Sequence, residues 1–216
     1  MSDAESSSSL ALHRSYDREE AAPARKRPKP GERREQILQA LAGMLEQPGA
    51  ERITTAALAA RLAVSEAALY RHFASKAQMF EGLIEFIEQS VFSLVNQIVS
   101  REAGGAHQAR KVVAMVMQFA EKNPGMTRVM VGDALVFENE RLQQRMNLFF
   151  DKIEATLKQS LRSAVEVSST ATPSLETQVR ASVLTAFLVG RLQRFARSGF
   201  KRLPSEHLEA SLALIF

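Results

Sequence analysis

Apolar residues recur along this chain at intervals of three and four positions, the spacing that places side chains on one face of an α-helix. No stretch shows the β-branched alternation of a half-buried strand. The pattern therefore predicts an all-α protein. Prolines, glycines and small polar residues divide the pattern into long helices over about 76–99, 107–121, 135–165 and 175–200, and short ones over 126–131 and 205–216.

Three shorter helices are expected before residue 76. The first starts at Glu32 and is stopped by a Pro-Gly pair at positions 48 and 49. Thr54 or Thr55 is a plausible N-cap for the second, and Ser65 for the third, because hydroxyl oxygens accept hydrogen bonds from the free N–H groups of a first turn. A tight turn at Ala63-Val64 separates these two helices.

This layout predicts a helix-turn-helix, whose second helix enters the major groove of DNA. Leu69 and Phe73, four positions apart, would anchor that helix on its buried side. Small and hydrogen-bonding side chains then face the groove and its rim, while hydroxyls and cations suit phosphates. Taken singly, Thr54 and Ser65 are better explained as caps and Lys76 as a solvated charge; taken together, DNA contact is favoured. The candidate DNA-contacting residues are Thr54, Thr55, Ser65, Glu66, Ala67, Ala68, Tyr70, Arg71, His72 and Lys76.

Composition divides the chain into three parts. Residues 1–30 carry a serine run, mixed charges and scattered prolines, and are predicted to be a disordered basic arm. The cations between Arg25 and Lys29 have two interpretations, a solubilising tail or an arm that touches phosphates or the minor groove. Residues 31–76 form the expected DNA-binding domain, and residues 77–216 a helical bundle for dimerisation and partner binding.

The net charge of +4 permits nucleic-acid binding without establishing it. Cysteine is absent, which excludes disulfides and thiolate metal sites and suits a reducing cytosol. Because the N-terminus is acidic and serine-rich and no long apolar run exists, we expect a cytoplasmic protein with no membrane partner. The four histidines are far apart and no phosphate-binding glycine loop is present, so we expect neither an enzyme nor a cofactor or metal site.

The segment from Ser65 to Phe73 carries leucine, tyrosine and histidine at positions 69, 70 and 72, and Ser75-Lys76 follows it. This signature resembles the TetR family of bacterial regulators and spans about a quarter of the chain. The resemblance implies a three-helix head, a helical C-terminal body and a homodimer that reads palindromic double-stranded DNA.

Further segments resemble one branch of those regulators, the nucleoid occlusion factors, and the likeness extends from about Arg33 to Pro204. These segments are 52–55, 64–73, 83–88, 121–128 and 137–143. The resemblance implies a nucleoid-associated division regulator that binds scattered palindromic sites and, while bound, antagonises the tubulin-like division protein FtsZ. Such a protein needs a second surface on its body. The candidate FtsZ-binding residues are Phe86, Glu85, Lys122 and Asn123.

Two of these candidates have structural alternatives. Phe86 lies at the edge of an inward-facing stripe, so core packing is the simpler role and an interface anchor the other. The run from Asn123 to Gly125 also reads as a helix stop and restart.

The dimer is expected to form through the two long C-terminal helices, two from each chain, as a four-helix bundle. The expected contact stripes are Val179, Val183, Ala186 and Gly190 on one helix, and Leu142, Met146, Phe149 and Ile153 on the other. The alternative role of these stripes is an internal core. An ordinary ligand-released repressor is the alternative function. With no tryptophan and two tyrosines, the chain gives no positive sign of a ligand pocket, and no small-molecule ligand is expected.

Overall fold

The computed structural model describes residues 31–47, 52–165 and 173–216. The arm expected over residues 1–30 lies outside the described residues, as does most of the loop expected over 165–173. Within the described ranges every regular element is helical, which confirms the all-α prediction. The elements are α1 (Glu32–Leu45), α2 (Thr55–Arg61), α3 (Glu66–Tyr70), α4 (Lys76–Arg101), α5 (Gly105–Lys122), α6 (Pro124–Met130), the 3-10 turn η1 (Asp133–Leu135), α7 (Glu140–Val165), α8 (Pro173–Arg197) and α9 (Leu208–Ala213).

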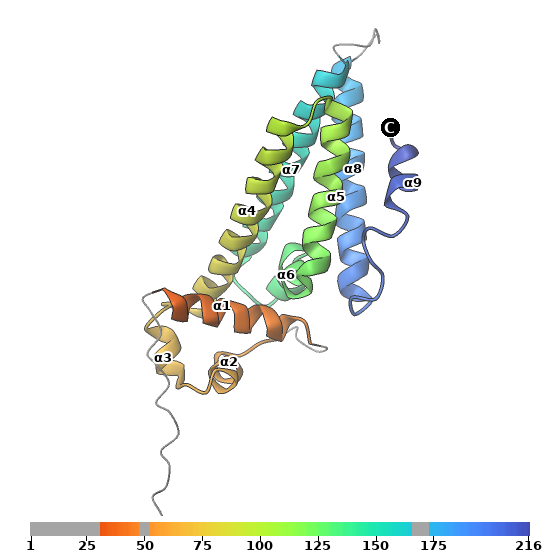
Figure 1. Ribbon diagram of the computed structural model, residues 1–216. Helices are drawn as coiled ribbons and strands as arrows, with labels where there is room; N and C mark the ends of the chain where they lie inside the picture. The colour runs from red at the N-terminus through yellow and green to blue at the C-terminus, as the bar shows by residue number, and fades with distance from the viewer. Residues whose placement is uncertain (1–30, 48–51, 166–172) are drawn as a thin grey trace, which may run out of the picture.

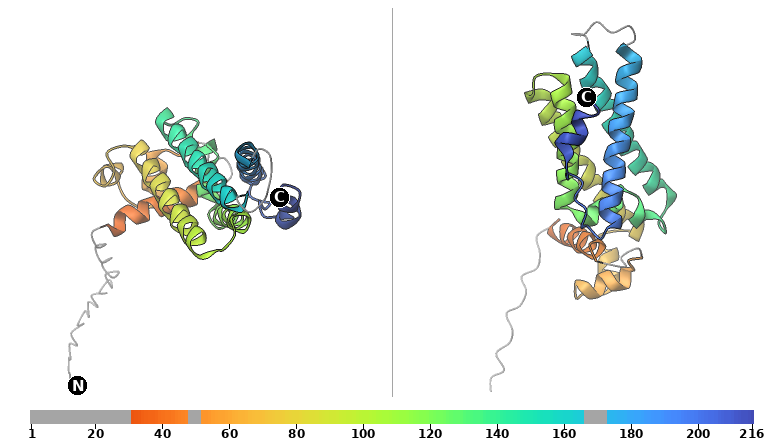
Figure 2. Two further views of the ribbon diagram at one scale, coloured as in Figure 1. Left: turned by 90° about the horizontal axis from the view of Figure 1, so that it is seen from above. Right: turned by 90° about the vertical axis from the view of Figure 1, so that its right-hand side faces the viewer.

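The first three helices gather at one end of an elongated helical bundle (Figure 1). We call α1 to α3 the head and α4 to α9 the body. Helix α4 starts at the head and runs the length of the body beside α5 and α7, while α6 lies at the base of the body against α1 (Figures 1 and 2). A single cluster of buried apolar side chains extends from Ile37 in α1 to Leu212 in α9. Head and body therefore share one hydrophobic core.

Hydroxyl side chains cap three of the helices, and the caps of α2 and α3 are the ones expected from the sequence. In each case the hydroxyl oxygen accepts a hydrogen bond from the backbone N–H three positions on, at 3.1 to 3.3 Å. The capping residues are Thr54 before α2, Ser65 before α3 and Ser75 before α4. The predicted turn between α2 and α3 is made by Ala63, which adopts a left-handed φ of 53°.

Two helix boundaries differ from the prediction for local reasons. Helix α7 begins at Glu140 and not at residue 135, because residues up to Leu135 form the separate 3-10 turn η1 and the Asn139 carboxamide caps the new helix. Helix α8 ends before residue 200, because Gly199 and Phe200 adopt φ angles of 63° and 64° that no α-helix can continue through.

We expected the apolar stripe of α7 at the dimer interface, and this expectation is wrong because the stripe lies in the core of the protomer. Its members are Leu142, Met146, Phe149 and Ile153, none more than 1% exposed. The Phe149 ring meets the rings of Phe92 and Phe150 edge-on, at centroid distances of 5.4 and 5.1 Å. Helices α4, α5 and α8 all pack against α7 and cover this face.

Candidate nucleic-acid interface

The head presents its hydrogen-bonding side chains outward on α2 and α3. Leu69 and Phe73 are buried at 1% exposure, which confirms their predicted anchoring role. Thr54, Ser65, Glu66, Ala67, Tyr70, Arg71 and His72 are exposed, whereas Thr55 and Ala68 are half-buried. The polar side of the recognition helix is thus open to a ligand as large as a DNA duplex.

A hydroxyl network that the sequence did not reveal ties α2 to α3. Thr55 Oγ1 donates a hydrogen bond to Glu66 Oε2 at 2.6 Å, and the Tyr70 hydroxyl donates to Thr55 Oγ1 at 3.5 Å. The Thr55 hydroxyl and the Glu66 carboxylate are thus already engaged with each other. Thr55 and Glu66 are accordingly the least favoured of the candidate DNA contacts.

The start of α1 is fastened to the end of the recognition helix. The Arg34 guanidinium donates to the backbone oxygen of His72 at 2.9 Å and lies 4.1 Å from the centroid of the Phe73 ring. The His72 imidazole remains exposed. Arg34 was not among the predicted site residues, because nothing in its local sequence points to a contact 38 positions away.

Lys76 joins the head to the body. Its ammonium forms an ion pair with Glu138, whose side chain is only 10% exposed, and lies 5.7 Å from the Phe80 ring. Glu138 precedes α7, and its ion pair with the first residue of α4 accompanies its low exposure. A phosphate contact by Lys76 would require this ion pair to open.

The second candidate surface lies on α4 and at the end of α5. Phe86 is 48% exposed, so the alternative of core packing for this ring is wrong. Glu85 is exposed beside it and accepts a hydrogen bond from Gln89 at 3.2 Å. Lys122 is exposed, whereas Asn123 is half-buried and donates from Nδ2 to the Phe119 backbone oxygen at 2.8 Å. Asn123 thus satisfies a carbonyl at the end of α5.

Gly125 marks a close backbone approach between head and body. A Cβ at this position would lie 2.0 Å from the Ala42 backbone oxygen in α1, inside any possible contact distance. Thr127 Oγ1 donates to the Ala120 backbone oxygen at 2.8 Å and holds α6 against the end of α5. The predicted helix stop and restart at residues 123–125 is therefore also the place where α1 of the head packs against the body.

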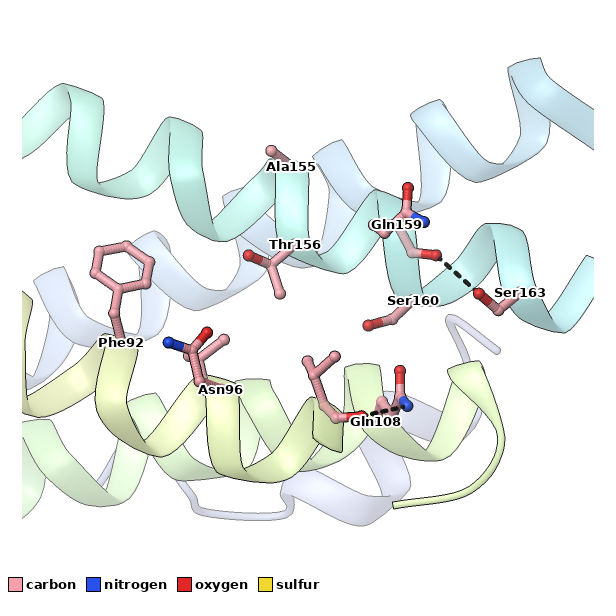
Figure 3. Close-up of a pocket in the computed structure, with 10 residues that line it drawn as sticks. Phe92, Asn96, Gln108, Ala155, Thr156, Gln159, Ser160 and Ser163 are labelled. Carbon is pink, nitrogen blue, oxygen red and sulfur yellow. Dashed lines mark hydrogen bonds between the residues drawn. The ribbon is translucent and has the colours of Figure 1, made fainter. Parts of the chain in front are cut away.

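A hollow of about 460 Å³ opens between α4, α5 and α7, towards the end of the body away from the head (Figure 3). Phe92 and Val95 form part of its apolar lining, and the side chains of Asn96, Thr156 and Ser160 lie around it. The volume suits a small ligand. In the described ranges no three histidines or acids are placed to hold a metal ion, and none of the helices there is long and apolar enough to cross a membrane.

A capped two-helix motif on a helical body defines a DNA-binding regulator of the TetR type. Residues 37–83 match the family described as bacterial regulatory proteins, tetR family, and residues 105–216 match the tetracyclin repressor-like, C-terminal domain of the SlmA-like kind. Among solved structures, the ketosteroid transcriptional regulator KstR2 of Mycobacterium tuberculosis superposes with a TM-score of 0.66 at 19% identity, covering 86% of this chain and 93% of that one. The regulator FadR from Bacillus subtilis, solved with stearoyl-CoA, also gives 0.66, at 13% identity over 84% of this chain and 96% of its own. These two likenesses concern the fold alone.

Curated relatives are much more similar. The nucleoid occlusion factor SlmA of Vibrio vulnificus (strain YJ016) is 50% identical over 188 residues, 87% of this chain and 95% of that protein. That of Idiomarina loihiensis is 49% identical over 82% of this chain and 90% of its own. The chain belongs to the SlmA family of nucleoid occlusion factors, within the TetR-type regulators, which is not an enzyme family.

Proposed function

We propose that this protein binds palindromic chromosomal sites as a homodimer and, while bound, restrains assembly of FtsZ, so that septa do not form over the nucleoid. The supporting observation is the pairing of an open DNA-reading head with an exposed aromatic on a separate face of the body. The relatives are nucleoid occlusion factors, and keeping division away from DNA calls for a DNA-binding surface and a second surface for the division machinery. On this proposal the protein works in the cytoplasm, at the nucleoid.

Different residues of the head, residues 31–76, would recognise the DNA sequence and supply the binding affinity. Ser65, Ala67 and Ala68 at the start of α3 suit the base edges, because small side chains let the helix approach closely and can meet thymine methyl groups. Tyr70 and Arg71 suit the flanking phosphates, whose neutralisation makes affinity fall with salt.

The body, residues 77–216, would form the interface between the two protomers of the dimer. Val179 and Val183 are 53% and 46% exposed on α8, with Ala186 one turn further along the same face. Leu148 adds an exposed apolar side chain on α7. Apolar side chains left in water on adjacent helices of one protomer are what a four-helix dimer interface would cover.

Thr54 tests the DNA contact, because its hydroxyl is exposed as well as capping α2. We expect Thr54→Ala to weaken binding of a specific duplex about tenfold, through loss of one phosphate hydrogen bond and part of the cap. Thr54→Ser keeps the hydroxyl and should bind as the native protein does. Thr54→Asp keeps the cap but places a negative charge beside the phosphate, so its affinity should be the lowest while its melting temperature is retained. Native affinity in the aspartate variant, measured by fluorescence anisotropy, would show that no phosphate lies there.

The division role is tested by sedimenting GTP-assembled FtsZ with this protein, alone and with a duplex selected from random sequence. We expect less FtsZ in the pellet, and a larger decrease with the selected duplex than with scrambled DNA. Phe86→Ala should lose most of this effect at unchanged DNA affinity, since the exposed ring contributes little to folding. Glu85 and Lys122 should modulate the same effect, and Asn123 less so because its amide is already engaged. Pellets equal with and without the native protein would refute the proposal.

The ligand-released repressor remains the alternative, and the hollow between α4, α5 and α7 favours it. Release of the selected duplex by an amphipathic small molecule, abolished by filling the hollow with Ser160→Phe, would support that function.

A further inference from the structure

The geometry points to a basic docking surface at the end of the body nearest the head, and we propose that it binds an acidic segment of the partner protein. Three parts of the chain make this surface: the end of α5, α6, and the end of α8 with the turn that follows. Its cations are Lys122, Arg128, Arg194, Arg197, Lys201 and Arg202. The proposal rests on the proposed function for the identity of the partner and adds the chemistry by which that partner is held.

Specific contacts bring the three parts together. The Ser205 backbone N–H donates to Glu121 Oε1 at 2.9 Å, which fixes the chain after α8 to the end of α5. The Arg128 guanidinium of α6 lies 5.1 Å from the centroid of the Phe200 ring. The Phe200 ring in turn meets Phe195 of α8 edge-on at 5.2 Å. The three segments that carry the cations therefore lie beside one another.

The turn after α8 fixes the backbone of its two cationic residues, Lys201 and Arg202. Gly199 and Phe200 both take left-handed φ angles, a costly conformation for phenylalanine that persists only where the surroundings enforce it. Ser198 Oγ accepts hydrogen bonds from the backbone N–H groups of Lys201 and Arg202 at 3.1 and 3.0 Å. Both long side chains project from this turn into solvent. A rigid backbone of this kind reduces the entropy lost on binding.

These cations are not neutralised by the protein itself. Across the described ranges none of the six takes part in an ion pair, whereas cations on other faces of the body do. Those pairs, each at 2.6 Å, are Arg145 with Glu88, Arg180 with Glu176, and Lys111 with Glu102. The Lys111 hydrogen bond also lowers the pKa of the Glu102 carboxyl.

Two acids beside this surface form no ion pair with its six cations. Glu121 accepts from the Ser205 N–H, and Glu206 faces His207 at 3.8 Å. Helix dipoles account for Lys122, Arg128, Arg194 and Arg197, which lie in the last turns of α5, α6 and α8, but not for Lys201 and Arg202, which follow α8. Gathered like charges repel one another, and a bound polyanion would relieve that repulsion.

The occupant is an acidic protein segment and not the duplex read by the head. Helices α2 and α3 lie on the side of α1 opposite to the ends of α6 and α8 (Figure 1). DNA held by α3 is therefore separated from this surface by α1. Lys122 belongs both to this surface and to the candidate FtsZ site, so the two share a residue.

The test uses the full-length protein saturated with its selected duplex, so that the head is already occupied. A fluorescein-labelled deca-glutamate peptide is the probe, and its anisotropy is followed at low and at physiological salt. The double variant Lys201→Glu, Arg202→Glu is compared with the native protein. The control, Arg101→Glu, Arg162→Glu, makes the same charge change with exposed residues near the far ends of α4 and α7. Both variants leave every backbone N–H in place.

We expect the Lys201, Arg202 variant to bind the peptide at least about tenfold more weakly than the control does, and to lose its effect in FtsZ sedimentation, at unchanged duplex affinity. Peptide binding equal to that of the control would overturn the proposal. A loss of duplex affinity confined to this variant would also overturn it, because the surface would then contact DNA. If the native protein leaves FtsZ pellets unchanged, the proposed function fails, while the peptide comparison still decides the chemistry of the surface.

Discussion

Replacing Gly125 with alanine is expected to destabilise the protein by about 2 kcal/mol, although alanine is the better helix former. The added Cβ would lie 2.0 Å from the Ala42 backbone oxygen, and a backbone atom cannot move aside as a flexible side chain can. Helix α1 must shift as a unit, which also displaces the recognition helix through Arg34 and His72. We expect a lower melting temperature by about 4 to 8 °C and weaker binding of the specific duplex.

Gly43→Ala is the matched control. Gly43 is helical like Gly125, and it lies in α1, the helix that Gly125 contacts. A Cβ there would meet only the flexible end of Arg61 at 3.6 Å, an ordinary contact. This variant should be as stable as the native protein or up to about 1 kcal/mol more stable. Equal melting temperatures for the Gly125 and Gly43 variants would show that α1 and α6 do not need this close approach.

Placing a carboxylate in the α8 stripe should have the largest effect on function. Val183 is 46% exposed in the protomer, so Val183→Asp costs the isolated chain little, but in a dimer it would bury two like charges at the same interface. We expect a monomer in analytical ultracentrifugation and at least about a hundredfold weaker binding of a palindromic duplex, because one head then binds without its partner.

Gln97→Asp makes the comparable change on an exposed position of α4, away from the α8 stripe, and should leave the dimer intact. A dimeric Val183→Asp protein with native affinity would place the interface elsewhere. Monomers that still bind the palindrome as tightly as the native protein would show that the two half-sites are read independently.

Local chemistry explains what the sequence predicted well. A hydroxyl before a helix needs only the next few residues to act as a cap, so Thr54, Ser65 and Ser75 could be recognised directly. Likewise, the four-residue spacing of Leu69 and Phe73 defines one buried face without reference to the rest of the fold.

Contacts between distant segments explain what could not be predicted. Lys76 and Glu138 are 62 positions apart, and both look like solvated charges in their own neighbourhoods. Phe86 sits at the edge of a stripe, where helical spacing alone does not decide burial, because that depends on which helix packs alongside. The apolar face of α7 was placed at the dimer interface for the same reason.

Because head and body share one core, the head depends on the body for its folding. A reading head cut out at residue 76 would lose the α4 and α6 surfaces that cover α1, and we expect such a fragment to remain largely unfolded. The helix-turn-helix is therefore not a portable module. A chimaera that changes the operator read by this protein should exchange side chains on α2 and α3 alone, and keep Ala42, Gly125 and the Lys76–Glu138 pair from a single parent.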